Sequence, residues 1–156
     1  MKVRKITERQ DVVTARTDET LDAVAEKMNL HRISGLPVVD EGGALAGLVA
    51  ASDLIRLSSP SVHLDIEKLM DINWSPAHRT TEHDPSWEQL PVTEVMVSEV
   101  CTVDDGADIR DAARMMATRG IHRVVVLDAD RRVQGVLSSF DLTALVAERG
   151  IGSATP

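Results

Sequence analysis

Apolar residues recur every three or four positions in two stretches of the chain, residues 21–28 and 109–116. In both stretches they occupy positions i, i+3, i+4 and i+7. This spacing predicts an α-helix with one apolar face, and that face is expected to pack on a core. Thr20 and Asp108 stand directly before the two stretches, where an oxygen side chain can cap the first free amides of a helix.

Short apolar runs flank each predicted helix and predict β-strands. Two runs follow each helix and are joined by a polar connection, which favours a hairpin. One further run precedes each helix. The predicted strands are residues 11–15, 36–40 and 45–49 in the first half and residues 100–103, 124–128 and 133–137 in the second. A helix-like stretch follows the last strand of each half, so each half has the order strand, helix, strand, strand, helix.

The two halves are copies of one repeat. "GLVAASDL" (47–54) and "GVLSSFDL" (135–142) align after a shift of 88 positions, 135 minus 47, and the match extends without a gap over residues 12–57 and 100–145. We predict a first domain at 1–57, a connector at 58–90, a second domain at 91–150 and a tail at 151–156.

The connector is rich in Pro, Ser and His and has no counterpart elsewhere, so we expect no domain there. Residues 61–72 could form a short helix. Trp74 and Trp87 are expected to anchor the connector to the repeats or to fill a dimer contact. Four possible metal ligands (His78, Glu82, His83 and Asp84) have a spacing that fits no known motif, which favours a solvated loop.

Composition limits the classes of function. The 156 residues suffice for one compact domain or two small modules that share a core, and 43% hydrophobic with 27% charged residues is typical of a soluble protein. The net charge is −8 and no stretch is strongly basic, so we expect no nucleic-acid partner. Cys101 is the single cysteine, which excludes an intrachain disulfide and favours a small buried side chain. Because a signal peptide and a long apolar run are both missing, we expect a cytoplasmic protein without membrane contact.

Asp53 and Asp141 occupy the same place in the two copies, at the start of the last predicted helix. A carboxylate there can accept hydrogen bonds from both hydroxyls of a ribose, and Ser138 adds a hydroxyl nearby. The alternative is structural: Ser138 or Ser139 caps the helix and Asp141 complements the helix dipole. Both interpretations stay open on these residues alone.

Longer segments around these aspartates resemble a known family. "HRISGLPVVDEGGALAGLVAASDLIRL" and "GIHRVVVLDADRRVQGVLSSFDLTAL" resemble the signature half of the cystathionine β-synthase (CBS) domain, and the resemblance covers residues 6–57 and 92–149. It implies an α/β (α+β) fold, a tandem CBS-domain repeat or Bateman module, with two β-α-β-β-α units packed as a pseudo-twofold disk. It also implies two clefts that bind adenosine-containing ligands, with the ribose held by Asp53 and Asp141.

The resemblance further implies that each cleft takes residues from both repeats. Asp53 would share a cleft with Cys101, Ile121, His122 and Arg123, and Asp141 and Ser138 would share the other with Val13, Ile33 and Ser34. Arg123 suits a phosphate, because its planar guanidinium bonds two oxygens. The first copy differs, with Ala50 in place of the serine and Ser34 and Gly35 where the second has His122 and Arg123.

Two functions follow from these observations. We predict a regulatory module that senses AMP, ADP, ATP or S-adenosylmethionine, requires no other cofactor, and signals to a regulated partner or a second copy. No phosphate-binding loop, nucleophile motif or metal motif is visible, so we predict that it is not an enzyme. The alternative is a ligand-free structural module for dimerisation. We expect a homodimer through the terminal helices, because four leucines would otherwise be incompletely covered: Leu54, Leu57, Leu142 and Leu145.

Overall fold

The computed structural model describes residues 1–58 and 87–149. The predicted helix at 61–72, Trp74, the four possible metal ligands of the connector and the tail lie outside the described residues. The chain forms two compact units. We call Val13–Glu99 the N-terminal unit, and Met1–Val12 with Val100–Pro156 the C-terminal unit.

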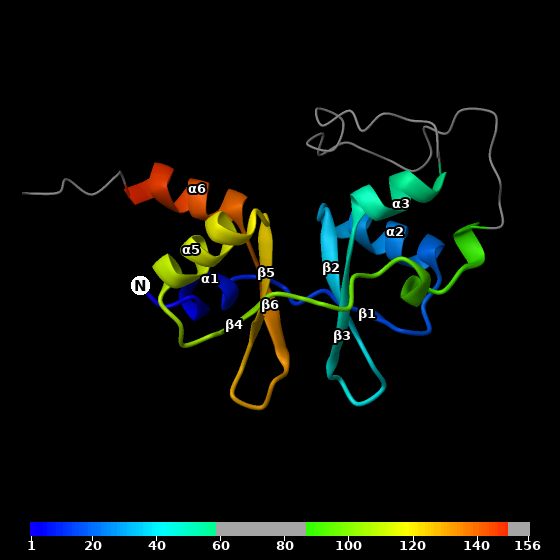
Figure 1. The fold of residues 1–156 in the computed structure, drawn as a ribbon, viewed down its shortest axis with the longest axis horizontal. Helices are drawn as coiled ribbons and strands as arrows, with labels where there is room; N and C mark the ends of the chain where they lie inside the picture. Colours follow the sequence, from blue (N-terminus) through cyan, green and yellow to red (C-terminus); the bar gives the residue numbers. More distant parts are fainter. Residues whose placement is uncertain (59–86, 150–156) are drawn as a thin grey trace, which may run out of the picture. The chain divides into compact units, whose positions relative to one another are not determined.

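The N-terminal unit is a three-stranded sheet with helices on one face (Figure 1). The central strand β2 pairs in parallel with β1 and antiparallel with β3. Its elements are β1 (Ala15–Arg16), α2 (Leu21–His31), β2 (Gly35–Val39), β3 (Leu45–Ala50), α3 (Ala51–Ser58) and the 3₁₀ turns η1 (Trp87–Gln89) and η2 (Val92–Glu94).

The C-terminal unit repeats this plan with the same strand register. Arg123 pairs with Ser138 as Gly35 pairs with Ala50, and both hairpins shift register at the equivalent place. Its elements are α1 (Arg4–Thr7), β4 (Thr102–Asp104), α5 (Ile109–Arg119), β5 (Arg123–Leu127), β6 (Val133–Ser138) and α6 (Ser139–Arg149). The predicted order of strand, helix, strand, strand, helix is confirmed in both units.

Helices α2 and α5 begin where the sequence predicts. The Thr20 hydroxyl accepts a hydrogen bond from the Ala23 amide at 3.4 Å, and the Asp108 carboxylate accepts one from the Arg110 amide at 3.0 Å. Both helices end on a residue in the left-handed conformation. That residue is Gly120 after α5 but Arg32 after α2.

Each apolar helix stripe fills the core of its own unit. In the N-terminal unit the stripe packs with Leu36, Val38 and Val49 of the sheet. In the C-terminal unit Ile109, Ala112 and Met116 pack with Val124, Val126 and Leu137. Each stripe therefore packs on the sheet of its own repeat.

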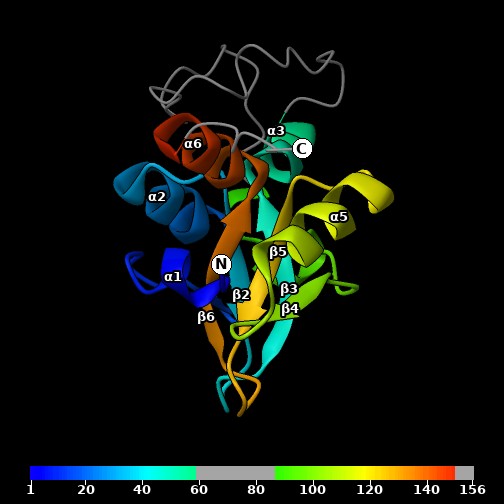
Figure 2. The same cartoon turned by 90° about the vertical axis from the view of Figure 1, so that its left-hand side faces the viewer.

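The first residues of the chain belong to the C-terminal unit. Val3 is fully buried in the core that contains Ile109, and α1 lies beside β6 (Figure 2). The Val3 amide donates to the Ala107 carbonyl at 3.0 Å, and the Ile109 amide donates to the Met1 carbonyl at 2.9 Å. This division differs from the predicted domain at 1–57. Full burial of a valine side chain stabilises by roughly 1.5–3 kcal/mol, so the segment contributes to the stability of the second repeat.

The segment before the second repeat makes the matching contacts in the N-terminal unit. The Val92 amide donates to the Glu19 carbonyl at 2.8 Å, and the Leu21 amide donates to the Leu90 carbonyl at 2.9 Å. Trp87 is buried in the same core, which confirms that this end of the predicted connector is anchored to a repeat. Because the chain passes between units near Val12 and Val13, β1 has only two residues where the sequence predicts five.

The terminal helices are covered differently from the prediction. Leu54 is only 1% exposed, so the expectation that it is incompletely covered is wrong. It fills the core of its own unit, and Leu57, Leu142 and Leu145 pack partly against the two cores. The apolar side chains that reach the surface of α6 are instead Phe140, 73% exposed, and Val146, 46% exposed.

Candidate functional site

Candidate residues gather at one end of the sheet in the N-terminal unit. Ala50 ends β3, and the Ala51 amide that opens α3 donates to the Ser34 carbonyl at 2.8 Å. Ile33 and Ser34 directly precede β2, and Asp53 lies in the first turn of α3. Val13 lies two residues before β1, which is parallel to β2, so it approaches the same end. The hairpin turn lies at the other end of the strands (Figure 1).

The C-terminal unit has the equivalent arrangement. The Ser139 amide that opens α6 donates to the His122 carbonyl at 2.8 Å, and Arg123 lies opposite Ser138 in the sheet. The Cys101 carbonyl accepts from the Val125 amide at 3.0 Å, which holds Cys101 beside β5. His122 is exposed, whereas Ile121, Arg123 and Cys101 are partly buried.

Ser138 and Asp141 hold each other by reciprocal hydrogen bonds. Oδ2 of Asp141 accepts from the Ser138 amide at 2.7 Å and from the Ser138 hydroxyl at 2.6 Å. The Asp141 amide donates back to Oγ of Ser138 at 3.2 Å. These bonds form the helix cap of the structural interpretation. They fix the carboxylate through Oδ2, and Oδ1 of Asp141 accepts no hydrogen bond within the part of the chain that the structure describes.

Asp53 is held less fully. Its Oδ2 accepts from the Ala50 amide at 2.9 Å, and the missing hydroxyl at Ala50 removes the second bond, as the sequence predicts. Its Oδ1 lies 3.5 Å from Nη2 of Arg56 on the next turn of α3. The Asp53 side chain is only 15% exposed. The two aspartates therefore share a position and an amide partner but differ in the surroundings of Oδ1.

The structure brings candidate residues together within each unit. Asp53 lies with Val13, Ile33 and Ser34 in the N-terminal unit, and Asp141 and Ser138 lie with Cys101, Ile121, His122 and Arg123 in the C-terminal unit. The sharing of each cleft between the two repeats stays a prediction from the family resemblance. Cys101 is only partly buried, and its Sγ accepts a hydrogen bond from Nη1 of Arg119 at 3.2 Å.

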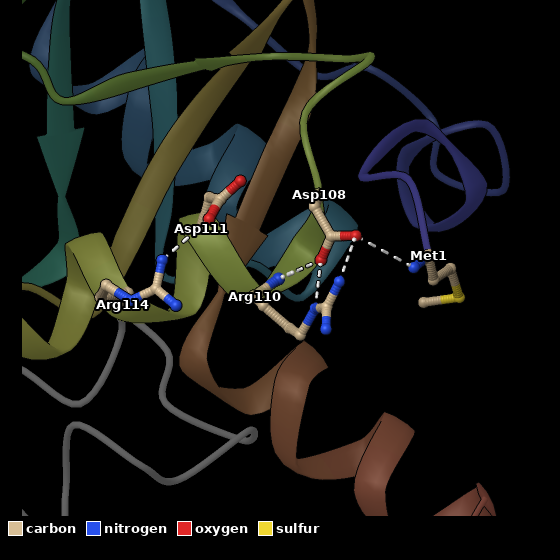
Figure 3. A network of polar contacts seen from close by, with 5 residues as sticks. All are labelled: Met1, Asp108, Arg110, Asp111 and Arg114. Carbon is tan, nitrogen blue, oxygen red and sulfur yellow. Dashed lines mark hydrogen bonds and ion pairs between the residues drawn. The ribbon is translucent and has the colours of Figure 1, made fainter.

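The start of α5 carries a network of hydrogen bonds and ion pairs (Figure 3). Oδ1 of Asp108 accepts from Nε of Arg110 at 2.9 Å, and Oδ2 lies 3.5 Å from the amino group of Met1. The side-chain hydrogen bond from Arg110 holds the pKa of Asp108 well below its usual range, and the same bond raises the pKa of Arg110. This network lies at the start of α5, whereas Ser138 and Asp141 lie at the start of α6.

Residues 1–58 and 87–149 contain no group of three or more His, Cys, Asp or Glu side chains placed to hold a metal ion. None of the helices formed by these residues is long and apolar enough to span a membrane.

Comparison with known proteins identifies relatives along most of the chain. The model of the CBS domain matches residues 3–60 and 92–148. Protein MJ1225 of Methanocaldococcus jannaschii is 28% identical over 133 residues, which span 85% of this chain but 43% of that protein. The chloroplastic CBS domain-containing protein CBSX1 of Arabidopsis thaliana is 26% identical, with 85% of this chain and 58% of that protein covered. Inosine-5'-monophosphate dehydrogenase of Halobacterium salinarum is 27% identical, with 96% and 24% covered. The chain thus spans less than two thirds of the length of each of these relatives.

Solved structures share the fold. The CBS domain of a CBS domain-containing membrane protein from Sphaerobacter thermophilus has a TM-score of 0.71 at 28% identity and covers 93% of this chain and 87% of that one. The CBS domain pair of protein MJ0100, solved with 5'-methylthioadenosine and S-adenosyl-L-methionine, has a TM-score of 0.70 at 22% identity, with 95% and 97% covered. CBSX2 in complex with AMP has a TM-score of 0.68 at 22% identity, with 94% and 96% covered. With two matched segments, two repeated units and these shared folds, the chain belongs to the CBS domain family and carries a tandem CBS pair.

Proposed function

We propose that this chain is a regulatory module that binds an adenosine-containing ligand and passes the occupied state to a partner protein or a second copy. The observation that carries the proposal is the carboxylate of Asp141, fixed through Oδ2 by Ser138 while Oδ1 accepts no hydrogen bond from the described residues. Solved CBS pairs with AMP or with S-adenosylmethionine and 5'-methylthioadenosine support an adenosyl ligand. The ligands that we propose are AMP, ADP, ATP or S-adenosylmethionine.

The fixed carboxylate suits a ribose. The two neighbouring hydroxyls of a ribose can both donate to a carboxylate, and hydrogen bonds to a charged acceptor are the stronger class. In this arrangement Ser138 orients the carboxylate, because its hydroxyl proton is already bonded to Oδ2. The helix dipole adds a favourable field for oxygen ligands at the start of α6. Adenine would then contact apolar residues beside the strand ends, where the candidates are Val13, Ile33, Cys101 and Ile121.

The role that we propose is binding and signalling, without catalysis. The match to part of a dehydrogenase fits this role, because the chain covers only 24% of that enzyme. No cofactor beyond the adenosyl ligand is required in this proposal. The single cysteine, which lies partly buried as a free thiol, suits a reducing compartment such as the cytoplasm.

A second candidate function is a dimerisation module with empty sites. The observation that favours it is the surface of α6, where Phe140 is 73% exposed and Val146 is 46% exposed. Exposed apolar side chains on one helix are typical of an association surface. The cap formed by Ser138 and Asp141 also stabilises α6 without any ligand.

Calorimetric titration with adenosine, AMP, ADP, ATP and S-adenosylmethionine separates the two functions. The sharpest variant is Asp141→Asn, because the amide oxygen can still accept from Ser138 while the free acceptor becomes an NH₂ donor. Loss of a hydrogen bond to a charged group costs about 1.5–3 kcal/mol, so we expect roughly ten- to a hundredfold weaker binding. Asp111→Asn is the matched control, because Asp111 is exposed on α5 and pairs with Arg114. If the unmodified protein binds none of these ligands, the dimerisation module is the better description.

A further inference from the structure

We infer that Arg56 selects ligands by charge at the Asp53 end, where it favours adenosyl ligands that carry a phosphate; this inference rests on the proposed function. Nη2 of Arg56 lies 3.5 Å from Oδ1 of Asp53. Oδ1 is the oxygen that remains after Oδ2 has bonded the Ala50 amide, and it is the equivalent of the free acceptor in Asp141. The guanidinium of Arg56 therefore lies next to Oδ1 of Asp53, the atom to which a ribose would bond.

The second repeat lacks this cation. Residue 144, which corresponds to Arg56 after the shift of 88 positions, is Ala144. Asp141 makes no ion pair within the described residues. Asp53 therefore has a cation on its own helix that Asp141 lacks, although Arg123 lies at the Asp141 end, where the first repeat has Gly35.

The charge of Arg56 affects how well the site accepts a ligand with a phosphate. A nucleotide bonded through its ribose brings its phosphate close to the aspartate, and two like charges repel strongly where water is partly excluded. Arg56 offsets that repulsion at Asp53, and its side chain, 64% exposed, is free to turn toward a phosphate and bond two of its oxygens.

If Arg56 only stabilises α3, the expected effect of its removal on ligand affinity is different. Charge pairs three residues apart stabilise a helix by a few tenths of a kcal/mol without any ligand, as Asp111 and Arg114 do on α5 at 2.9 Å. Such a pair would affect adenosine and AMP alike, because the helix is the same for both. The ratio of the two affinities therefore separates charge selection from helix stabilisation.

The test is calorimetric titration with adenosine and with AMP, with the number of sites fitted. We expect Arg56→Ala to weaken AMP about threefold, within the range for an exposed charge pair, and to leave adenosine unchanged. Arg56→Lys keeps the charge and should retain the AMP affinity. Ala144→Arg should strengthen AMP at the other end by a similar factor. Arg114→Ala, which breaks the equivalent pair on α5, should change neither ligand.

The outcomes are distinguishable. If the unmodified protein binds AMP and Arg56→Ala leaves the ratio of AMP to adenosine affinity unchanged, the inference is wrong and the proposed function stands. If the unmodified protein binds neither adenosine nor AMP, the proposed function fails and the role of Arg56 fails with it. High salt should reduce the effect of Arg56→Ala, because exposed charges are screened.

Discussion

The side chain of Thr7 lies directly against the backbone of Gly135. A Cβ atom built on Gly135 would lie 3.1 Å from Cγ2 of Thr7 and 3.2 Å from its Cβ. Thr7 is 3% exposed, so this side chain has little room to move. In the N-terminal unit, Met96 and Val97 cross Gly47 in the same way.

Alanine at either glycine should loosen the segment that packs against it, Thr7 at Gly135 and Met96 with Val97 at Gly47. A Cβ on Gly47 would lie 2.9 Å from the carbonyl oxygen of Val97, which is held by paired hydrogen bonds with Leu48. We expect each substitution to cost about 2–3 kcal/mol, because Gly135 also has φ 157°, a backbone conformation that residues with a Cβ rarely adopt. Chemical denaturation measures both. Gly106→Ala is the control, because nothing lies within 4 Å of its Cβ position, and a loss as large as that of Gly47→Ala would contradict the steric explanation.

The end of α2 offers a stabilising substitution. Arg32 has φ 53° and ψ 45°, the left-handed conformation that glycine adopts at the end of α5. This conformation costs a residue with a Cβ about 1–2 kcal/mol, part of which returns through the greater freedom of glycine in the unfolded chain. Arg32→Gly should therefore raise the unfolding free energy by about 0.5–1 kcal/mol. Gly120→Ala should lower it, and a stability change of the same sign in both variants would refute this account.

Stability should depend on the charge of Asp108 over a defined pH range. The bond from Arg110 holds the pKa of Asp108 below its usual range, so the folded state is favoured wherever the carboxylate is ionised. This contribution is complete above the unfolded pKa of about 3.9 and disappears as the pH falls through the folded pKa. Asp108→Asn retains an oxygen that caps α5 and removes only the charge. The difference in Tm between the two proteins should shrink below about pH 4. A difference that stays constant from pH 7 to pH 3 would exclude the ion pair as its source.

Phe140 provides a test of association. It is 73% exposed on α6 and belongs to neither core, so its replacement leaves the folded unit intact. If a second copy covers α6, as the proposed homodimer requires, Phe140→Asp should give monomers by light scattering at micromolar concentration. Leu30→Asp is the matched control, because Leu30 is 75% exposed on α2 and should not affect association. A monomeric unmodified protein would rule out the homodimer at that concentration.

Repetition made much of the fold predictable from the sequence. The helix stripes, their caps at Thr20 and Asp108, and the hairpins occur twice, so each copy supports the assignment of the other. The placement of Asp53 and Asp141 at helix starts follows from the same alignment.

The two segments that complete the opposite unit, Met1–Val12 and Trp87–Glu94, could not be predicted in this way. Helix α1 has only four residues, and its burial comes from contacts with residues about a hundred positions away. A signal exists, because Val3 and Ile6 correspond to Val92 and Val95 at a shift of 89, 92 minus 3, which is one more than the main repeat. The pair of Arg56 with Asp53 is a local contact, but a sequence does not reveal which carboxylate oxygen a neighbouring cation occupies.

These two segments also determine whether one repeat could fold without the other. Each unit is completed by residues that precede the other repeat, Met1–Val12 in one case and Trp87–Glu94 in the other. A chain with only one repeat would need a second molecule to supply the missing segment, as in domain swapping. When the two copies are joined in one polypeptide, each unit receives its completing segment from the same molecule. Completion of each unit then no longer depends on protein concentration.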